Sequence, residues 1–321
     1  MDIKQNFSNY KWLILAMLVI AAILVAIGAP TLVPICVAIA GIVPVLVPDR
    51  RMIFLLIAVF VVLPLMYPMY LDTDVTPEVK SMYDAIEELE SGSVILMSFD
   101  FDPATRPELY PAALAFMRHS VQRGHRIITM ALWPLGVSLA EEAVRDVIID
   151  DWNVENPDRT YEYGQDYVHL PYMPGGIVVI NQLITSFDEN FPRDIRNTPI
   201  EDIAAMRGVT NLMDIDFVFA LSSGDPGLRD WIMGGADRAN RRVAGAATAV
   251  AAPEFYPYIH AGQLVGLMGG LKGASEYEEL IGILGTATAG MDAQSLAHLA
   301  IIVFIIVGNA MFFMDRRRTR F

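Results

Sequence analysis

Cysteine is nearly absent from this sequence, since Cys36 is the only one in 321 residues. One thiol excludes an intrachain disulfide and any metal site built from paired cysteines. Cys36 lies within an apolar run, where cysteine usually serves as a small buried side chain. The cysteine content therefore gives no indication of the compartment.

Basic residues are scarce in the central part of the chain. Residues 72–296 contain 34 Asp and Glu but only 15 Lys and Arg, a net charge of −19, whereas the rest of the chain carries +5. A strongly negative surface repels the phosphates of nucleic acids and of anionic lipids. We therefore expect no nucleic-acid partner.

Common catalytic signatures are missing as well. No glycine-rich phosphate loop or Walker lysine follows any expected strand, and the five histidines show no HExxH spacing. Ser222-Ser223 is not part of a GxSxG motif. Chemistry that depends on nucleotides, and serine hydrolysis, are therefore disfavoured.

Long apolar runs without charge are frequent, in keeping with a hydrophobic content of 54%. Because a helix needs about 20 apolar residues to cross a bilayer, the pattern predicts three transmembrane helices within 1–71 (about 12–28, 31–48 and 52–70) and a fourth within 297–321. We expect the first to be a retained helix, because Pro30 would follow a signal-peptide cut after Ala29. The prolines of the second run leave open a transport path, but the lack of ionisable residues in the first three runs favours a kinked packing helix.

The basic residues outside the central region lie beside these runs. With four spans, all of them face one side of the membrane: Lys4, Lys11, Arg50, Arg51 and the basic tail at 316–320. The positive-inside rule makes that side cytoplasmic. We therefore predict a multi-pass protein of the cytoplasmic (inner) membrane, with both termini cytoplasmic and an acidic extracytoplasmic domain at 72–259.

The central region alternates short apolar segments with helical patterns. The segments expected to form strands end in turns that carry proline: 93–103, 126–134, 167–174, 215–226 and 242–253. Strands that are apolar on both faces and alternate with helices indicate a parallel sheet covered on both sides. We predict an α/β fold, namely a mostly parallel, five-stranded, doubly wound (Rossmann-like) domain inserted between the third and fourth transmembrane helices.

Residues 260–296 are rich in glycine and are predicted to form a helical juxtamembrane segment, with a flexible loop as the alternative. Gly262, Gly266, Gly269 and Gly273 recur at a spacing of three or four residues. On a helix this spacing makes a ridge of small residues that lets a second helix approach closely. We therefore expect these glycines to pack against another subunit in an oligomer.

Candidate ligand-binding residues follow the expected strands, because ligands of parallel sheets bind beyond the carboxyl ends of the strands. Asp100 and Asp102 leave the first strand and Asp225 follows the fourth, so their carboxylates could hold Mg²⁺ or Ca²⁺ and serve catalysis. The other expected rim residues are Trp133, Tyr172, Arg229, Glu254 and Tyr256. Alternatively, Asp100 and Asp102 cap the following helix or order their own turn.

The pair Asp100 and Asp102 after an apolar strand resembles the acid motifs of haloacid-dehalogenase-type phosphohydrolases. The resemblance covers only a few residues and implies a metal-dependent phosphohydrolase. Two features depart from the family pattern. Pro103-Ala104-Thr105 stands where the family has Gly-Thr, and Lys80 and Lys272 are the only lysines of the acidic region.

Together these observations favour a non-catalytic structural, assembly or ligand-binding subunit of an oligomeric membrane complex, with no cofactor expected. The expected partners are the lipid bilayer and either further copies of the chain or other membrane subunits. One alternative is a metal-dependent hydrolase that uses Asp100, Asp102 and Asp225. A second alternative is an accessory subunit of a transporter.

Overall fold

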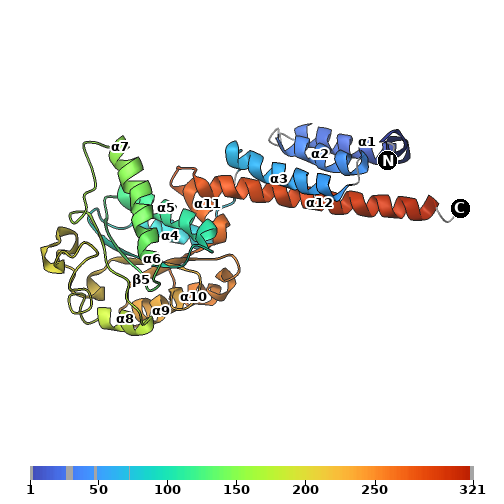
Figure 1. Ribbon diagram of the computed structural model, residues 1–321. Helices are drawn as coiled ribbons and strands as arrows, with labels where there is room; N and C mark the ends of the chain where they lie inside the picture. Colours follow the sequence, from blue (N-terminus) through green and yellow to red (C-terminus); the bar gives the residue numbers. More distant parts are fainter. Residues whose placement is uncertain (1–2, 27–31, 47–48, 72, 319–321) are drawn as a thin grey trace. The chain divides into compact units, whose positions relative to one another are not determined.

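The computed structural model describes residues 3–26, 32–46, 49–71 and 73–318. The chain divides into two compact units. One, here the helical unit, combines the residues up to 72 with those from 288 onward, and the other, here the α/β domain, comprises residues 73–287. Figure 1 shows the helices of the former and the layered helices and strands of the latter.

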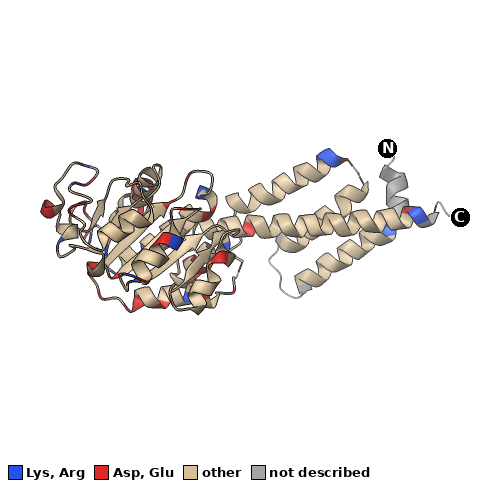
Figure 2. Ribbon diagram, turned by 90° about the horizontal axis from the view of Figure 1, so that it is seen from below, with Lys and Arg blue, Asp and Glu red and all other residues tan. Residues whose placement is uncertain are grey.

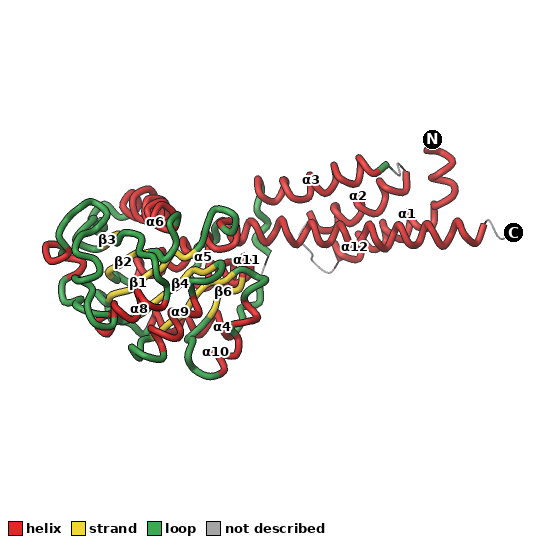
Figure 3. The backbone as a smooth tube through the Cα atoms, turned by 60° about the horizontal axis from the view of Figure 1, so that its bottom comes forward, coloured by secondary structure: helices red, strands yellow, loops and turns green. Residues whose placement is uncertain are grey.

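The α/β domain contains a six-stranded sheet among its described residues, and every neighbouring pair of strands is parallel. The strands lie side by side in the order β3-β2-β1-β4-β5-β6 (Figure 3). They are β1 (Val94–Asp100), β2 (Arg126–Met130), β3 (Tyr167–His169), β4 (Phe217–Ser222), β5 (Arg242–Ala247) and β6 (Leu267–Gly269). This order is that of a Rossmann-like sheet, so the α/β expectation is confirmed.

Helices cover both faces of this sheet. Successive side chains of a strand point to opposite faces, so one strand contributes to the core on each side. Ile95, Met97 and Phe99 of β1 belong to one hydrophobic core, whereas Val94 and Leu96 belong to a second. Figure 1 shows the two helical layers. The first layer is α4 (Pro77–Glu87), α5 (Arg106–Gln122), α6 (Gly136–Val144) and α11 (Gly270–Leu280), and the second is α8 (Ile177–Leu183), α9 (Leu228–Trp231) and α10 (Tyr256–His260).

Shorter helical segments complete the α/β domain. Two π-helices, η1 (Arg145–Trp152) and η5 (Ile232–Ala236), continue α6 and α9, and η1 leads into α7 (Asn153–Glu155). Four 3₁₀ turns lie in the connections: η2 (Ile200–Asp202), η3 (Ala204–Met206), η4 (Leu212–Asp214) and η6 (Ala252–Glu254).

The ends of α4 and α5 follow from local sequence. α4 begins with Pro77, whose missing N–H and fixed φ suit the first position of a helix. Glu78 in its first turn places a negative charge beside the positive end of the helix dipole, which is favourable. α5 ends just before Gly124, which has a φ of 78° and so takes the left-handed conformation that closes many helices.

The number of strands and the form of the glycine-rich segment differ from the sequence prediction. The sixth strand, β6, lies inside the stretch 260–296 that was expected to be helical, and it pairs with β5 from Leu267 onward. Three residues are too short to show a strand periodicity of two. The strand forms because the free edge of β5 supplies hydrogen-bonding partners.

The expected glycine ridge is not formed, because the four glycines do not share a helix. Gly262 lies in a turn with a φ of 75°, Gly266 precedes β6, Gly269 ends it and Gly273 lies in α11. A Cβ at Gly266 would lie 2.3 Å from the carbonyl oxygen of Glu78 in α4. Gly266 therefore allows close packing inside the domain rather than forming part of a helical surface for another subunit.

The helical unit comprises α1 (Ile3–Ala26), α2 (Leu32–Leu46), α3 (Arg50–Met66) and α12 (Thr286–Arg318). Among the described residues, only α12 is both long and apolar enough to cross a membrane, over Thr286–Arg316. α1 is broken by the non-helical Tyr10, so its apolar part is Tyr10–Val25. The expected ends of the first two runs fall partly at 27–31 and 47–48, outside the described residues.

The four helices of this unit share one hydrophobic core. It includes Ile14 of α1, Val37 of α2, Phe60 of α3 and Val303 of α12. Hydrogen bonds reinforce the packing at two levels. The Tyr10 hydroxyl donates to both carboxylate oxygens of Asp315, at 2.8 and 2.7 Å.

A second set of bonds links the segment after α3 to α12. The buried carboxylate of Asp292 accepts the backbone N–H groups of three consecutive residues, Met69, Tyr70 and Leu71, at 2.7, 2.9 and 3.1 Å. Tyr70 has a φ of 51°, so the backbone curls around the carboxylate. The segment leaving α3 is thereby fastened to α12.

Candidate functional site

The strand order reverses between β1 and β4, and this is the switch point at which ligands of open α/β sheets bind. Asp100 is the last residue of β1 and lies in register with Ser222, the last residue of β4. The sequence-predicted candidate Asp100 therefore occupies the switch point itself. The carboxyl ends of the six strands and the segments that follow them are called the carboxyl edge below.

Asp100 is completely buried and its carboxylate is surrounded by donors. Its Oδ1 accepts the backbone N–H of Leu132 at 2.8 Å, and its Oδ2 accepts the indole N–H of Trp231 at 3.2 Å. The Ser98 hydroxyl lies 2.9 and 2.8 Å from the two oxygens. One side chain thus ties together β1, the segment after β2 and α9.

The electrostatics of this position are unusual for a carboxyl group. Burial raises the pKa of Asp100 to about 7, although its three hydrogen-bond donors oppose the rise, and the negative charge of Asp230 adds to it. Desolvation disfavours the ionised form of an acid, and donors to the carboxylate favour it. Asp100 therefore changes its charge near neutral pH.

Asp102, two residues on, orders its own turn. Its carboxylate accepts the backbone N–H of Ala104 at 3.0 Å and of Thr105 at 3.4 Å, just before α5 begins. This is the Asx-type bonding that the sequence left open as an alternative to ligand binding. Asp102 and Asp100 thus differ in burial and in partners.

Asp225 lies in the exposed turn between β4 and α9. The turn is held from two sides, because the Trp133 indole N–H donates to the carbonyl of Pro226 at 2.7 Å and Asp230 accepts the N–H of Gly227 at 3.0 Å. Across the part of the chain that is described, no three His, Cys, Asp or Glu side chains converge on a possible metal ion. Asp100, Asp102 and Asp225 are thus not gathered into a metal centre.

The remaining rim residues are spread along the carboxyl edge. Arg229 and Glu254 form an ion pair that links α9 to η6. Tyr172 and Tyr256 are exposed, after β3 and in α10 respectively. All five rim candidates belong to segments that follow strands, two of them are paired with each other, and Trp133 is bonded to a backbone carbonyl, while their role in ligand binding stays a prediction.

Sequence reasoning missed several features of this edge. Ser98 could have been found, because it precedes Asp100 by two residues and so lies on the same face of β1. Trp231 gave no such signal, since its approach to Asp100 depends on the docking of α9. The edge also carries exposed apolar side chains, which follow β2, β3 and β5: Leu135, Val178 and Val250.

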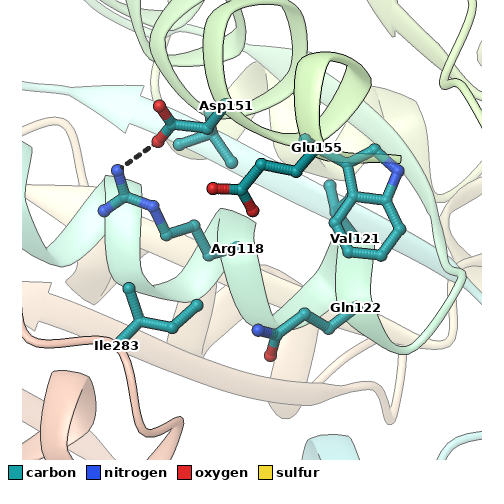
Figure 4. A pocket seen from close by; sticks show the side chains of 8 residues that line it. Arg118, Val121, Gln122, Asp151, Glu155 and Ile283 are labelled. Carbon is teal, nitrogen blue, oxygen red and sulfur yellow. Dashed lines mark hydrogen bonds and ion pairs between the residues drawn. The ribbon is translucent and has the colours of Figure 1, made fainter. Parts of the chain in front are cut away.

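A cavity lies away from the carboxyl edge, between α5 and the helix formed by η1 and α7 (Figure 4). Its volume is about 270 Å³. Arg118 of α5 forms an ion pair with Asp151 of η1 across it, at 2.6 Å. The lining residues are Arg118, Val121, Gln122, Val147, Asp151, Trp152, Glu155 and Ile283. Nothing in the sequence pattern indicated this cavity.

No protein-family model matches this chain, and comparison with curated proteins finds no relative.

Proposed function

We propose that this protein is a non-catalytic subunit of a membrane complex, which displays an acidic α/β domain on the extracytoplasmic side and uses the carboxyl edge of its sheet to bind another copy of the chain. The observation that carries the proposal is the state of the switch point. The carboxylate found there is enclosed and bonded by Ser98, Leu132 and Trp231. A carboxylate so enclosed has no access to a substrate.

Membrane insertion of all four helices of the helical unit is part of this proposal. α1, α2 and α3 share a core with α12, which alone has the length and composition of a span among the described residues. Large apolar side chains also lie on the outside of the unit, including Trp12, Phe54 and Ile305. Apolar side chains on the outer surface of a packed bundle suit lipid better than water.

The orientation of the bundle rests on its charges. The described basic residues of the helical unit lie near helix ends: Lys11 at the start of the apolar part of α1, Arg50 and Arg51 at the start of α3, and Arg316 near the end of α12 (Figure 2 shows Lys and Arg in blue). The bond between Tyr10 and Asp315 likewise places the start of the apolar part of α1 beside the end of α12. By the positive-inside rule this end faces the cytoplasm. The domain that follows the third span then lies on the opposite side.

The exposed apolar residues of the carboxyl edge supply the proposed contact. Val178 and Val250 are 57% and 91% exposed, and both follow carboxyl ends of parallel strands. Single exposed apolar residues are common, but several at one edge of a domain mark an interaction surface.

The mass of the purified protein in mild detergent tests this proposal. We expect an oligomer for the unchanged chain and a smaller species for the double variant Val178→Glu, Val250→Glu. Val154→Glu is the matched control, because Val154 is 71% exposed in α7, where the chain has run back toward the other edge of the sheet. A monomeric parent protein would overturn the proposal, and an unchanged mass of the double variant would overturn the role of this edge.

A metal-dependent hydrolase is the second candidate, favoured by one observation. The pKa of Asp100 is raised to about 7 at the position where ligands of such sheets bind, and carboxyl groups with raised pKa values are common at active sites. This candidate predicts that millimolar Mg²⁺ or Ca²⁺ raises the unfolding temperature and that Asp102→Asn with Asp225→Asn removes the effect. The first candidate predicts the same unfolding temperature with metal and with chelator.

A further inference from the structure

We infer that the cavity between α5 and η1 binds a small organic cation, an ammonium group carried on a short apolar body. This inference goes beyond the proposed function and does not rest on the oligomeric state, since all residues that line the cavity belong to one α/β domain.

The charges of the cavity leave room for one positive charge. Three ionisable side chains line it, and Arg118 is paired with Asp151 at 2.6 Å. Glu155 is an exposed residue and makes no hydrogen bond or ion pair with any described residue. Figure 4 shows its carboxylate directed into the cavity. The lining thus carries a net charge of −1, which an incoming ammonium group would neutralise.

Arg118 is not available to bind an anion instead. Its side chain is 19% exposed, and its guanidinium is already bonded to Asp151. The buried carboxylate of Glu278 also lies near, because a Cβ at Gly285 would stand 2.7 Å from its Oε1 and 3.6 Å from the Nη1 of Arg118. An anionic ligand would have to compete with these carboxylates.

The π-helix is what assembles the wall of the cavity. η1 runs for eight residues with a hydrogen-bond step of five, so Val147 and Trp152, five residues apart, come onto one face. In an α-helix of about 3.6 residues per turn, two such residues would point in different directions. π-helices are rare and are frequently found at functional sites. The π-helical geometry of η1 therefore brings residues of the cavity wall onto one face.

Trp152 is held in a fixed orientation before any ligand arrives. Its indole N–H donates to the carbonyl of Arg159 at 2.8 Å, and its ring meets the ring of Tyr161 at 86°, with 6.3 Å between centroids. An ordered indole that lines the same cavity as a carboxylate is a suitable partner for an ammonium group, because the aromatic ring attracts cations. A preorganised wall also lowers the entropy cost of binding.

The size and the remaining lining define the rest of the ligand. A volume of about 270 Å³ lies just below the range of roughly 300–1,000 Å³ typical of drug-sized ligands, so the ligand is compact. Val121, Val147 and Ile283 offer apolar contact, and the amide of Gln122 offers one further polar group. A short alkyl or arylalkyl amine matches this combination.

The test is a titration of the full-length protein in detergent, followed by calorimetry, with three probes of similar size: butylammonium, butanol and butyrate. We expect butylammonium to bind more tightly than both others. Equal binding of butanol would show that only the apolar wall acts, and tighter binding of butyrate would assign the cavity to anions. Either result would overturn the inference, as would no detectable binding of butylammonium.

Variants locate the binding. Glu155→Gln should weaken the binding of butylammonium about two- to fivefold, because it removes the charge of an exposed carboxylate but keeps the shape. Glu189→Gln, an exposed change outside the cavity, is the matched control and should bind like the parent. Trp152→Phe should retain most of the affinity and Trp152→Leu should lose it, with circular dichroism to confirm folding. Unchanged binding by Glu155→Gln would refute the assignment.

Discussion

The indole N–H of Trp231 in α9 donates a hydrogen bond of 3.2 Å to Oδ2 of Asp100, the last residue of β1. Both side chains are completely buried. The bond joins a helix that follows β4 to the strand beside β4, at the place where the order of the sheet reverses. A carboxylate that would otherwise be an isolated buried charge is thereby used to hold the switch point together.

Removal of this donor should therefore be costly. Trp231→Phe removes the donor to Oδ2 of Asp100 and should lower the free energy of unfolding by about 1–3 kcal/mol. The smaller ring should add a further loss of packing. Trp133→Phe is the control, because the Trp133 indole donates to a backbone carbonyl in a partly exposed turn. Denaturant unfolding should show a clearly smaller loss for it. Equal losses would contradict the special role of Asp100.

The raised pKa of Asp100 predicts a dependence of stability on pH. Its pKa is about 7 in the folded protein against 3.8 ordinarily, so between these values the folded state holds a proton that the unfolded state has released. The neutral form of Asp100 is the one that the folded state favours, so its stabilising effect is complete below about pH 4. This effect is lost as the pH rises through 7, because the buried carboxyl group then ionises. Asp100→Asn should remove this loss. The difference between the pH profiles of parent and variant, measured by denaturant unfolding, checks it.

Buried histidines predict the opposite slope. Burial lowers the pKa of both His125 and His169 to about 4, so the folded state keeps them neutral while the unfolded state binds protons below pH 6.5. The contribution of these two histidines to stability should therefore fall as the pH drops from 6.5 toward 4. His169→Asn should make this fall shallower by up to one proton. An unchanged slope would show that His169 titrates alike in both states.

The three hydrogen bonds that Asp292 accepts from the segment after α3, here called the Asp292 clamp, should control local opening of that backbone. Asp292→Asn replaces one acceptor oxygen by an amide group, so it cannot accept all three N–H groups of Met69, Tyr70 and Leu71. We expect faster hydrogen exchange in peptides covering 67–71, measured by mass spectrometry. Asp74→Asn is a control in the α/β domain and should leave these peptides unchanged. Exchange at the parent rate would mean that the clamp does not limit opening.

Gly266 should be intolerant of any side chain. A Cβ there would lie 2.3 Å from the carbonyl oxygen of Glu78 and 2.8 Å from Cβ of Met82, so Gly266→Ala should lower stability by about 1–3 kcal/mol. Gly282→Ala is the comparison, because its φ of 70° adds backbone strain but no atom lies within 4 Å of the new methyl group. Thermal unfolding separates the clash from the strain. A smaller effect at Gly266 than at Gly282 would contradict the packing seen at α4.

The sequence was sufficient to predict the architecture of the α/β domain but not its edges. The strands β1 to β5 are visible as apolar runs because their burial on both faces leaves a strong pattern, whereas β6 has three residues and depends on pairing with β5. The glycine spacing at 262–273 suggested a helix, but the close approach to Glu78 that Gly266 permits is a tertiary fact. Short periodicity cannot distinguish a packed glycine from a helical ridge.

The candidate site shows the same division. Asp100 was found because parallel topology fixes where strand ends lie, but its enclosure by Trp231 depends on the docking of α9. The cavity beside η1 was not found, because nothing local in Arg145–Trp152 distinguishes a π-helix from an α-helix. Its geometry emerges only when α5 and η1 pack together.

The carboxylates of Asp292 and Glu276 each bond to backbone N–H groups far away in the sequence. Asp292 accepts the N–H of Leu71 within the helical unit, and Glu276 accepts the N–H of Thr76 at 2.9 Å within the α/β domain, so in each unit two segments about 200 residues apart in the sequence are bonded together. An insertion whose two ends are already fastened together adds little closure entropy, since doubling the length of a loop costs only about 0.6 kcal/mol. We therefore expect the residues between two such bonded segments to be exchangeable, by recombination or by design.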